Sequence, residues 1–96
     1  MARGEMLTVF SYDVSNNKRR RKIAKLLEDA ATRVQYSVFE TRMSRQKAEA
    51  LAQRLAAHLG GGDSLRLYVI GHDGERRSRV FGHGAPFESK EGYWLF

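Results

Sequence analysis

Hydrophobic and polar residues alternate along this chain with two different periods, and each period predicts one kind of element. A repeat of two, typical of strands whose side chains point to opposite faces, occurs in three main stretches and a weaker fourth. The predicted strands are residues 6–14, 33–41, 63–71 and 76–81. A repeat of three to four, typical of helices with one apolar stripe, occurs twice. The predicted helices are residues 17–31 and 44–59.

Polar residues and glycines mark the ends of these predicted elements. Ser15 or Asn16 is the expected N-cap of the first helix, and Ser44 is the expected N-cap of the second. The run Gly60-Gly61-Gly62 ends the second helix, with its first glycine as a left-handed C-cap. The segment His72-Asp73-Gly74-Glu75 favours a turn before the last predicted strand.

Strict alternation assigns each strand residue to one of two faces. In the first strand, Asp13 shares a face with Leu7 and Val9, and Tyr12 lies on the other. In the second strand, the same rule places Phe39 opposite Val34, Tyr36 and Val38, exposed among polar residues. An exposed Phe there indicates either contact with a ligand or partner, or a partly covered sheet face.

The pattern as a whole favours an α+β fold of the ferredoxin-like βαββαβ type, in which two helices cover one face of an antiparallel sheet. The other face is too apolar for water, so we expect a face-to-face homodimer. Its apolar residues are Leu7, Val9, Phe39, Tyr68 and Ile70. We expect one domain over residues 1–96, with a core at about 6–82. The tail, residues 84–96, ends in Gly-Tyr-Trp-Leu-Phe and is expected to form a last strand at a sheet edge, that of a second subunit.

Composition narrows the class of partner. Seventeen Lys and Arg against eleven Asp and Glu give a net charge of +6 and a pI near 10.1, which favours a polyanion, nucleic acid before membrane. No apolar stretch is long enough for a membrane span or a signal peptide, so we expect a cytoplasmic protein without a membrane partner. The absence of cysteine excludes disulfides, thiolate metal sites and thiol nucleophiles.

Five consecutive cations open the first helix, where the partial positive charge of a helix N-terminus normally favours acids. An anion such as phosphate would offset this repulsion; the alternative is a solvated charged face. Arg20 continues the apolar stripe backward, so it should lie at the rim of the buried face near the end of the first strand. A second basic group lies in the last predicted strand. The candidate nucleic-acid-binding residues are Lys18, Arg19, Arg20, Arg21, Lys22, Arg76, Arg77 and Arg79.

Asp13 ends the first strand immediately before this basic run, where a hard cation would bridge protein and phosphate; the alternative is a helix cap. Mg²⁺ needs more oxygens than one carboxylate supplies, and a dimer with its open faces together would bring two Asp13 side chains to one site. His72, Asp73 and His83 match no standard ligand spacing. No Ser-His-Asp constellation and no P-loop is present.

Several motifs resemble one known family. They are Phe10-Ser11-Tyr12-Asp13-Val14, Ile23-Ala24-Lys25-Leu26-Leu27, Arg33-Val34-Gln35-Tyr36-Ser37-Val38-Phe39-Glu40 and Asp63-Ser64-Leu65-Arg66-Leu67-Tyr68. Across residues 6–71, the chain resembles the small CRISPR-associated adaptation protein, the second core protein of spacer acquisition. The resemblance implies a ferredoxin-like fold, a homodimer with exchanged C-terminal strands, and an endonuclease dependent on Mg²⁺ or Mn²⁺ that acts on single-stranded RNA or double-stranded DNA. It also implies that the dimer bridges two dimers of the CRISPR integrase and holds DNA.

The same resemblance implies roles for single residues. Asp13 matches the metal-binding aspartate and Tyr12 the residue before it, while Arg20, Arg33 and Phe39 match positions implicated in nuclease activity. Two other functions remain open at this level. One is a non-catalytic nucleic-acid-binding scaffold of the CRISPR integration complex, and the other is an RNA-binding module with the same element order. The stretch 65–69 of the third predicted strand lacks the aromatic signature of such modules.

Overall fold

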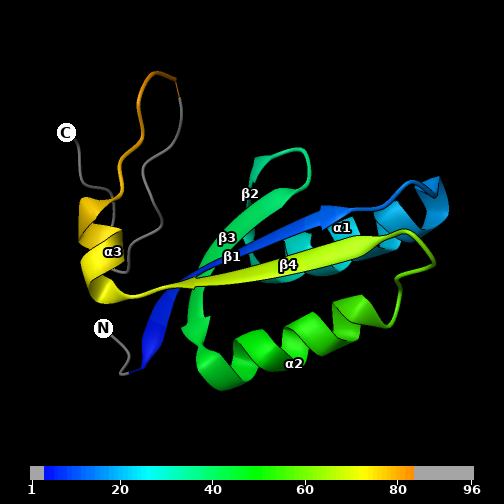
Figure 1. Cartoon of the computed structure of the whole chain (residues 1–96), viewed down its shortest axis with the longest axis horizontal. Helices are drawn as coiled ribbons and strands as arrows, with labels where there is room; N and C mark the ends of the chain where they lie inside the picture. The colour runs from blue at the N-terminus through cyan, green and yellow to red at the C-terminus, as the bar shows by residue number, and fades with distance from the viewer. Residues whose placement is uncertain (1–3, 84–96) are drawn as a thin grey trace.

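The computed structural model describes residues 4–83, which form a four-stranded antiparallel sheet with two helices on one face (Figure 1). The elements are β1 (Glu5–Asp13), α1 (Asn17–Ala30), β2 (Thr32–Gln35), β3 (Val38–Ser44), α2 (Arg45–Ala56), β4 (Ser64–Ile70) and α3 (His72–Arg77). The strand order is β2-β3-β1-β4, so β1 lies in the middle with antiparallel partners on both sides. The α+β ferredoxin-like βαββαβ prediction is confirmed, with α3 as an addition.

The core lies between the sheet and the apolar stripes of α1 and α2. Phe10 in β1 pairs across the sheet with Phe39 in β3 and with Leu67 in β4, and both Phe side chains are fully buried. The helices add Ile23 and Leu27 from α1 and Ala48, Leu51 and Leu55 from α2. Both helices therefore direct an apolar stripe toward the sheet, because such a stripe needs an apolar surface to cover it.

Both predicted N-caps are confirmed. The side chain of Asn16 accepts a hydrogen bond from the Arg19 N–H (2.9 Å), and the Ser44 hydroxyl accepts one from the Lys47 N–H (3.2 Å). The end of the second helix differs from the prediction, since α2 ends at Ala56 and turns follow it. Of the three glycines, Gly62 rather than Gly60 has a left-handed backbone, with φ of 85°. The reversal thus comes after the helix, immediately before β4.

The predicted single strand over residues 33–41 is wrong, because this segment is a hairpin of β2 and β3 with a turn at Tyr36 and Ser37. The usual two-residue hairpin turns need a positive φ, supplied by Gly, Asn or Asp. Neither Tyr36 nor Ser37 has a positive φ, and the pairing instead shifts between Arg33 and Gln35. The turn therefore carries none of the residues that would reveal it in a sequence.

This hairpin also corrects the predicted position of Phe39. Arg33 and Phe39 are cross-strand partners and share a face, as alternation predicted, but this face is the one that the helices cover. Phe39 therefore shares the helix-covered face with Thr41 and Met43, and it is completely buried. Its burial supplies core packing that the sequence pattern had assigned to the other side of the sheet.

The predicted strand at residues 76–81 is also wrong. Residues 72–77 form the short helix α3, and residues 78–81 belong to no helix or strand. Two acids, Asp73 and Glu75, occupy its first turn and two arginines its last, an order that suits the helix dipole. Glu75 pairs with Arg42 of β3, so α3 is attached to one end of the sheet. The fourth strand of the fold comes from the β2–β3 hairpin instead.

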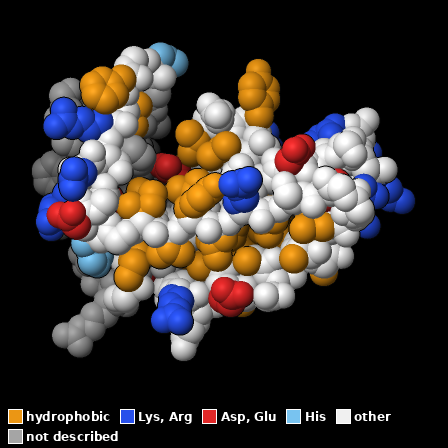
Figure 2. All heavy atoms as spheres, viewed as in Figure 1, with side chains coloured by type: hydrophobic (Ala, Val, Ile, Leu, Met, Phe, Trp, Pro, Cys, Tyr) orange, Lys and Arg blue, Asp and Glu red, His pale blue; other side chains and the backbone are white. Residues whose placement is uncertain are grey.

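The face not covered by α1 and α2 is partly apolar, as predicted. Val9 and Tyr68 are cross-strand neighbours there, as are Leu7 and Ile70. Leu7 is fully buried, and its strand β1 contacts α3, whereas Tyr68 remains 47% exposed. Figure 2 shows hydrophobic side chains gathered over the strands in the middle of the view, with Lys and Arg at both ends. The expected C-terminal strand, in residues 84–96, lies outside the described residues.

Candidate functional site

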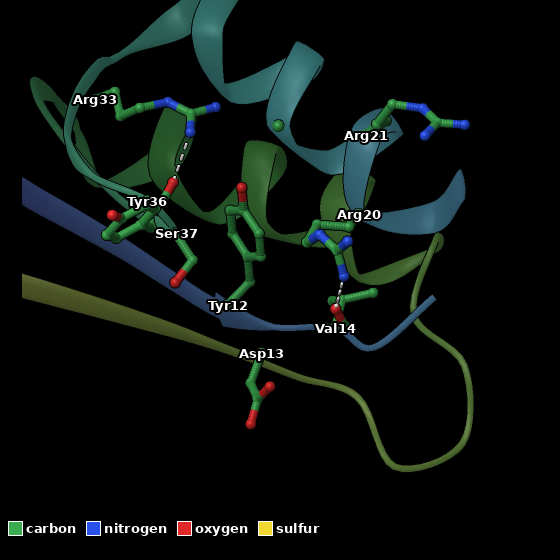
Figure 3. Close-up of a pocket in the computed structure, with 9 residues that line it drawn as sticks. Tyr12, Asp13, Val14, Arg20, Arg21, Arg33, Tyr36 and Ser37 are labelled. Atoms are coloured by element: carbon green, nitrogen blue, oxygen red, sulfur yellow. Dashed lines mark hydrogen bonds between the residues drawn. The ribbon is translucent and has the colours of Figure 1, made fainter. Parts of the chain in front are cut away.

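Asp13 and Tyr12 end β1 and point to opposite faces of the sheet. The Tyr12 ring lies on the helix-covered face, is 5% exposed and stacks on Phe39 with ring centroids 6.3 Å apart. The Asp13 side chain is exposed and points the other way (Figure 3). This follows from strand alternation, so the residues that the sequence paired at the site do not converge on one point within a single chain.

A hollow of about 380 Å³ opens at this end of β1. Three segments form it: the end of β1, the first turns of α1 and the β2–β3 turn. Its lining residues are Tyr12, Asp13, Val14, Arg20, Arg21, Ala24, Arg33, Tyr36 and Ser37. Three arginines and one carboxylate line it, so the hollow has a positive balance that suits an anion such as phosphate.

Arg20 is fixed by the loop between β1 and α1. Its guanidinium donates to the carbonyl oxygens of Val14 (2.8 Å) and Ser15 (3.2 Å), and also to the side chain of Asn17. The predicted place at the rim of the core near the end of β1 is therefore confirmed. These bonds hold the backbone immediately after Asp13, so Arg20 fixes the loop while its charge still faces the hollow.

Arg33 lies on the other side of the hollow and is also held. It donates to the Tyr36 carbonyl oxygen and to the Glu28 carboxylate, both at 2.9 Å, and its guanidinium carbon is 4.9 Å from the centroid of the Phe39 ring. The Tyr12 hydroxyl points between Arg33 and Arg20 (Figure 3). Burial raises the pKa of Tyr12, and the two nearby arginines oppose this only in part. Tyr12 is therefore a neutral O–H donor at physiological pH.

Arg19 forms a different contact, which the sequence did not reveal. Its Nε lies 3.0 Å from Oδ2 of Asp63, a carboxylate with 1% exposure that also accepts the Gly60 N–H at 2.7 Å. The Gly60 hydrogen bond, followed by that of Arg19, holds the pKa of Asp63 below its ordinary value. A Cβ on Gly60 would lie 2.6 Å from the Arg19 guanidinium carbon, so a larger residue there would displace the Arg19 side chain. Arg19 thus ties α1 to the loop before β4.

The remaining predicted cations divide into two groups at opposite ends of the sheet (Figure 1). Lys18, Arg21 and Lys22 are exposed on the first turns of α1, near the hollow. In α3, Arg76 pairs with Asp73 at 2.8 Å and Arg77 approaches the same carboxylate at 4.0 Å; Arg79 follows and is exposed. The structure therefore places Asp13, Tyr12, Arg20 and Arg33 around one hollow, with the Asp13 side chain directed away from the other three, and leaves the α3 cations far from them.

Asp13 is the one carboxylate among the residues that line the hollow. A metal ion held there by this chain would therefore have a single carboxylate as its protein ligand. Among residues 4–83 its carboxylate has no hydrogen-bond or ion-pair partner, so its oxygens are available to a cation. The same residues hold no cluster of three or more His, Asp or Glu side chains, and His72, Asp73 and His83 form none. Because Mg²⁺ keeps several waters and takes one or two carboxylates, Asp13 fits as one ligand of a shared site.

The chain matches known proteins over most of its length. The family described as CRISPR associated protein Cas2 matches residues 6–78. A CRISPR-associated endoribonuclease Cas2 of Synechocystis is 46% identical over 68 residues, which cover 69% of this chain and 74% of the relative. Across the part of the chain that the structure describes, no helix is long and apolar enough to cross a membrane.

Solved structures show the same fold. The Thermus thermophilus protein TT1823 superposes with a TM-score of 0.75 and 35% identity, over 88% of this chain and all of that one (100%). A chain of a partial Cas6-RT-Cas1–Cas2 complex superposes with a TM-score of 0.61 and 24% identity, over 79% of this chain and 90% of that one. Taken with the sequence matches, these likenesses show that the chain belongs to the CRISPR-associated protein Cas2 family.

Proposed function

We propose that this protein is a metal-dependent endonuclease that cleaves phosphodiester bonds of RNA or DNA and takes part in CRISPR spacer acquisition. The observation that carries the proposal is the exposed Asp13 carboxylate, unpaired among residues 4–83, beside a hollow lined by Arg20, Arg21 and Arg33. A carboxylate that holds a cation and arginines that hold phosphate are two elements that metal-assisted phosphodiester hydrolysis uses. The names of the relatives, which are endoribonucleases, support the same reaction.

Asp13 would hold Mg²⁺ or Mn²⁺, which when bound supplies positive charge at the phosphodiester and lowers the pKa of a water ligand. The other residues would act through position and charge. Arg20 fixes the loop after Asp13, and Arg33 is held against Phe39, so both guanidinium groups are in place before a phosphate arrives. Tyr12, which remains protonated, offers an O–H donor to a phosphate oxygen or a leaving group.

The working unit would be a homodimer. One Asp13 supplies too few oxygens for Mg²⁺, and a second copy would add another carboxylate. The open sheet face, with Val9 and Tyr68 as neighbours, offers an apolar surface for that contact. In the part of the chain that is described, β4 pairs on one side with β1 and leaves its other edge to a further strand. The C-terminal strand exchange expected from the sequence would use this edge.

A second function is favoured by the direction of the Asp13 side chain, which points away from Tyr12 and from the arginines beside it. If the carboxylate and the arginines do not converge on one phosphate, the protein is a non-catalytic scaffold that binds DNA and bridges two dimers of the CRISPR integrase. The fold shared with a chain of a Cas1–Cas2 complex supports this role. The basic groups at α1 and α3 would then hold the DNA backbone without cleaving it.

The substitution Asp13→Asn distinguishes enzyme from scaffold, because it keeps size and shape but removes the charge that holds a cation. Cleavage of single-stranded RNA and duplex DNA would be measured with and without Mg²⁺. If the protein is a nuclease, Asp13→Asn abolishes metal-dependent cleavage, while nucleic-acid binding survives or tightens because a negative charge is removed. Asp29→Asn is a matched control, since Asp29 is an exposed acid near the end of α1, outside the hollow.

Two outcomes would contradict the nuclease. Equal cleavage by the wild type and Asp13→Asn would indicate a contaminating nuclease. Absence of cleavage in both, with normal DNA and integrase binding, would support the scaffold instead.

A further inference from the structure

Tyr36 lies in the two-residue turn between β2 and β3 with 88% of its surface exposed. Turns of this kind usually hold small polar residues or glycine, which solvate well and bend easily. A large aromatic ring there gains little from packing in this chain. Its exposure instead offers a flat π surface to another molecule.

The backbone beneath this ring is held at both turn residues. The Tyr36 carbonyl oxygen accepts a hydrogen bond from Arg33 at 2.9 Å, and the Ser37 carbonyl oxygen accepts one from the Tyr12 N–H at 3.2 Å. Arg33 is itself fixed by Glu28 and lies over the buried Phe39 ring. The turn is therefore tied to β1 and to the core, so the Tyr36 ring projects from a fixed support and little backbone entropy is lost on binding.

The surroundings of the ring select the kind of ligand. Tyr36 lines the same hollow as Arg20 and Arg21, and Arg21 is exposed with no ion-pair partner among residues 4–83 (Figure 3). A strand of nucleic acid alternates phosphates with flat bases. A site with cations in a hollow and an aromatic ring at its border matches this alternation.

We propose that Tyr36 stacks on an unpaired base of a single strand whose adjacent phosphate lies in the hollow. The proposal rests on the nucleic-acid function given above. It adds a residue that makes the protein bind single strands more tightly than duplexes. In a duplex the faces of the bases are covered by their neighbours, so the ring has nothing to stack on without unstacking the helix. Phosphate contacts alone would bind both forms.

The test measures binding in EDTA, where metal-dependent cleavage cannot occur. Fluorescence anisotropy would give the affinity for labelled oligouridine, for a blunt RNA duplex, and for a strand of equal charge with abasic sites in place of bases. Tyr36→Ala should weaken binding to oligouridine by about 5- to 150-fold, the usual range for one stacked base, and leave duplex binding unchanged. Tyr36→Trp should restore it. On the abasic strand, the wild type and Tyr36→Ala should bind equally.

Phe81→Ala is the matched control, because Phe81 is 82% exposed and lies after α3, away from the hollow. It should not change binding to any of the three ligands. The proposal is overturned if Tyr36→Ala weakens duplex and single-strand binding equally, if it weakens neither, or if the abasic strand still distinguishes it from the wild type. A protein that shows the Tyr36 effect but no cleavage with Mg²⁺ would contradict the nuclease and support the stacking surface.

Discussion

The guanidinium carbon of Arg33 lies 4.9 Å from the centre of the Phe39 ring, and the two residues are direct neighbours across the β2–β3 hairpin. This pair joins the core to the candidate site. One side of the contact is a fully buried ring, and the other is a half-exposed cation that also holds the Tyr36 carbonyl oxygen and Glu28. A change at either residue is therefore transmitted to the turn that borders the hollow.

We expect Phe39→Ala to lower the free energy of unfolding by about 3–5 kcal/mol, because it leaves a cavity in the core and removes the ring beneath Arg33. Phe39→Leu, which keeps most of the volume, should cost less. Urea unfolding measures both. A Phe39→Ala variant as stable as the wild type would contradict the buried position.

Arg20 and Arg21 are adjacent cations with different expected effects. Arg20→Ala leaves the carbonyl oxygens of Val14 and Ser15 without their donor, so it should lower stability by about 1.5–3 kcal/mol as well as weaken nucleic-acid binding. Arg21→Ala removes an exposed charge and should weaken binding with unchanged stability. Unfolding curves and anisotropy titrations of the two variants test this. Equal effects on stability would show that the Arg20 hydrogen bonds contribute little.

Binding should fall steeply with salt, because bound cations release counterions from the phosphates. Replacing Lys18, Arg21 and Lys22 by Gln should reduce the slope of log affinity against log salt by about one per lost contact. The same change at Arg76 and Arg77 should have a smaller effect, since both already face the Asp73 carboxylate. Equal slopes for the wild type and the α1 variant would mean that this basic run is simply a solvated face.

The Asp63 carboxylate should make stability depend on acid pH. Its pKa is lowered in the folded state, chiefly by the Gly60 N–H, so its stabilisation is present above the ordinary aspartate value of 3.8 and is lost as the pH falls through the folded pKa. The wild type should therefore lose stability more steeply in that range than Asp63→Asn, which is less stable at neutral pH. Thermal unfolding over a pH series measures this. Asp29→Asn, at an exposed site, should follow the wild-type curve.

A charge on the open sheet face should disrupt the proposed homodimer. Tyr68→Glu places a carboxylate at a 47% exposed position beside Val9, where it costs little in a monomer but would be buried in a face-to-face dimer. Light scattering at micromolar concentration should give a dimer for the wild type and a monomer for the variant. Val80→Glu, at a 44% exposed position after α3, should remain dimeric. A monomeric wild type would exclude the homodimer.

Properties that depend on near neighbours along the chain could be predicted from the sequence. The helical stripes of α1 and α2 appear as spacings of three and four, and the caps Asn16 and Ser44 act on residues three positions ahead. The opposite directions of Asp13 and Tyr12 also follow from alternation in one strand. The basic run at the start of α1 and the net charge were likewise visible without coordinates.

Tertiary structure decided what depends on contacts between distant segments. The turn at Tyr36 has no glycine or asparagine signal, and hydrogen bonds from Tyr12 and Arg33 hold its backbone. The pairing of β3 with β1 then sets Phe39 opposite Phe10 on the helix-covered face, where it is fully buried. Arg19 resembles its neighbouring cations in sequence, yet its partner Asp63 lies 44 residues away. Such partners cannot be found from local periodicity, because the fold alone brings them within hydrogen-bond distance.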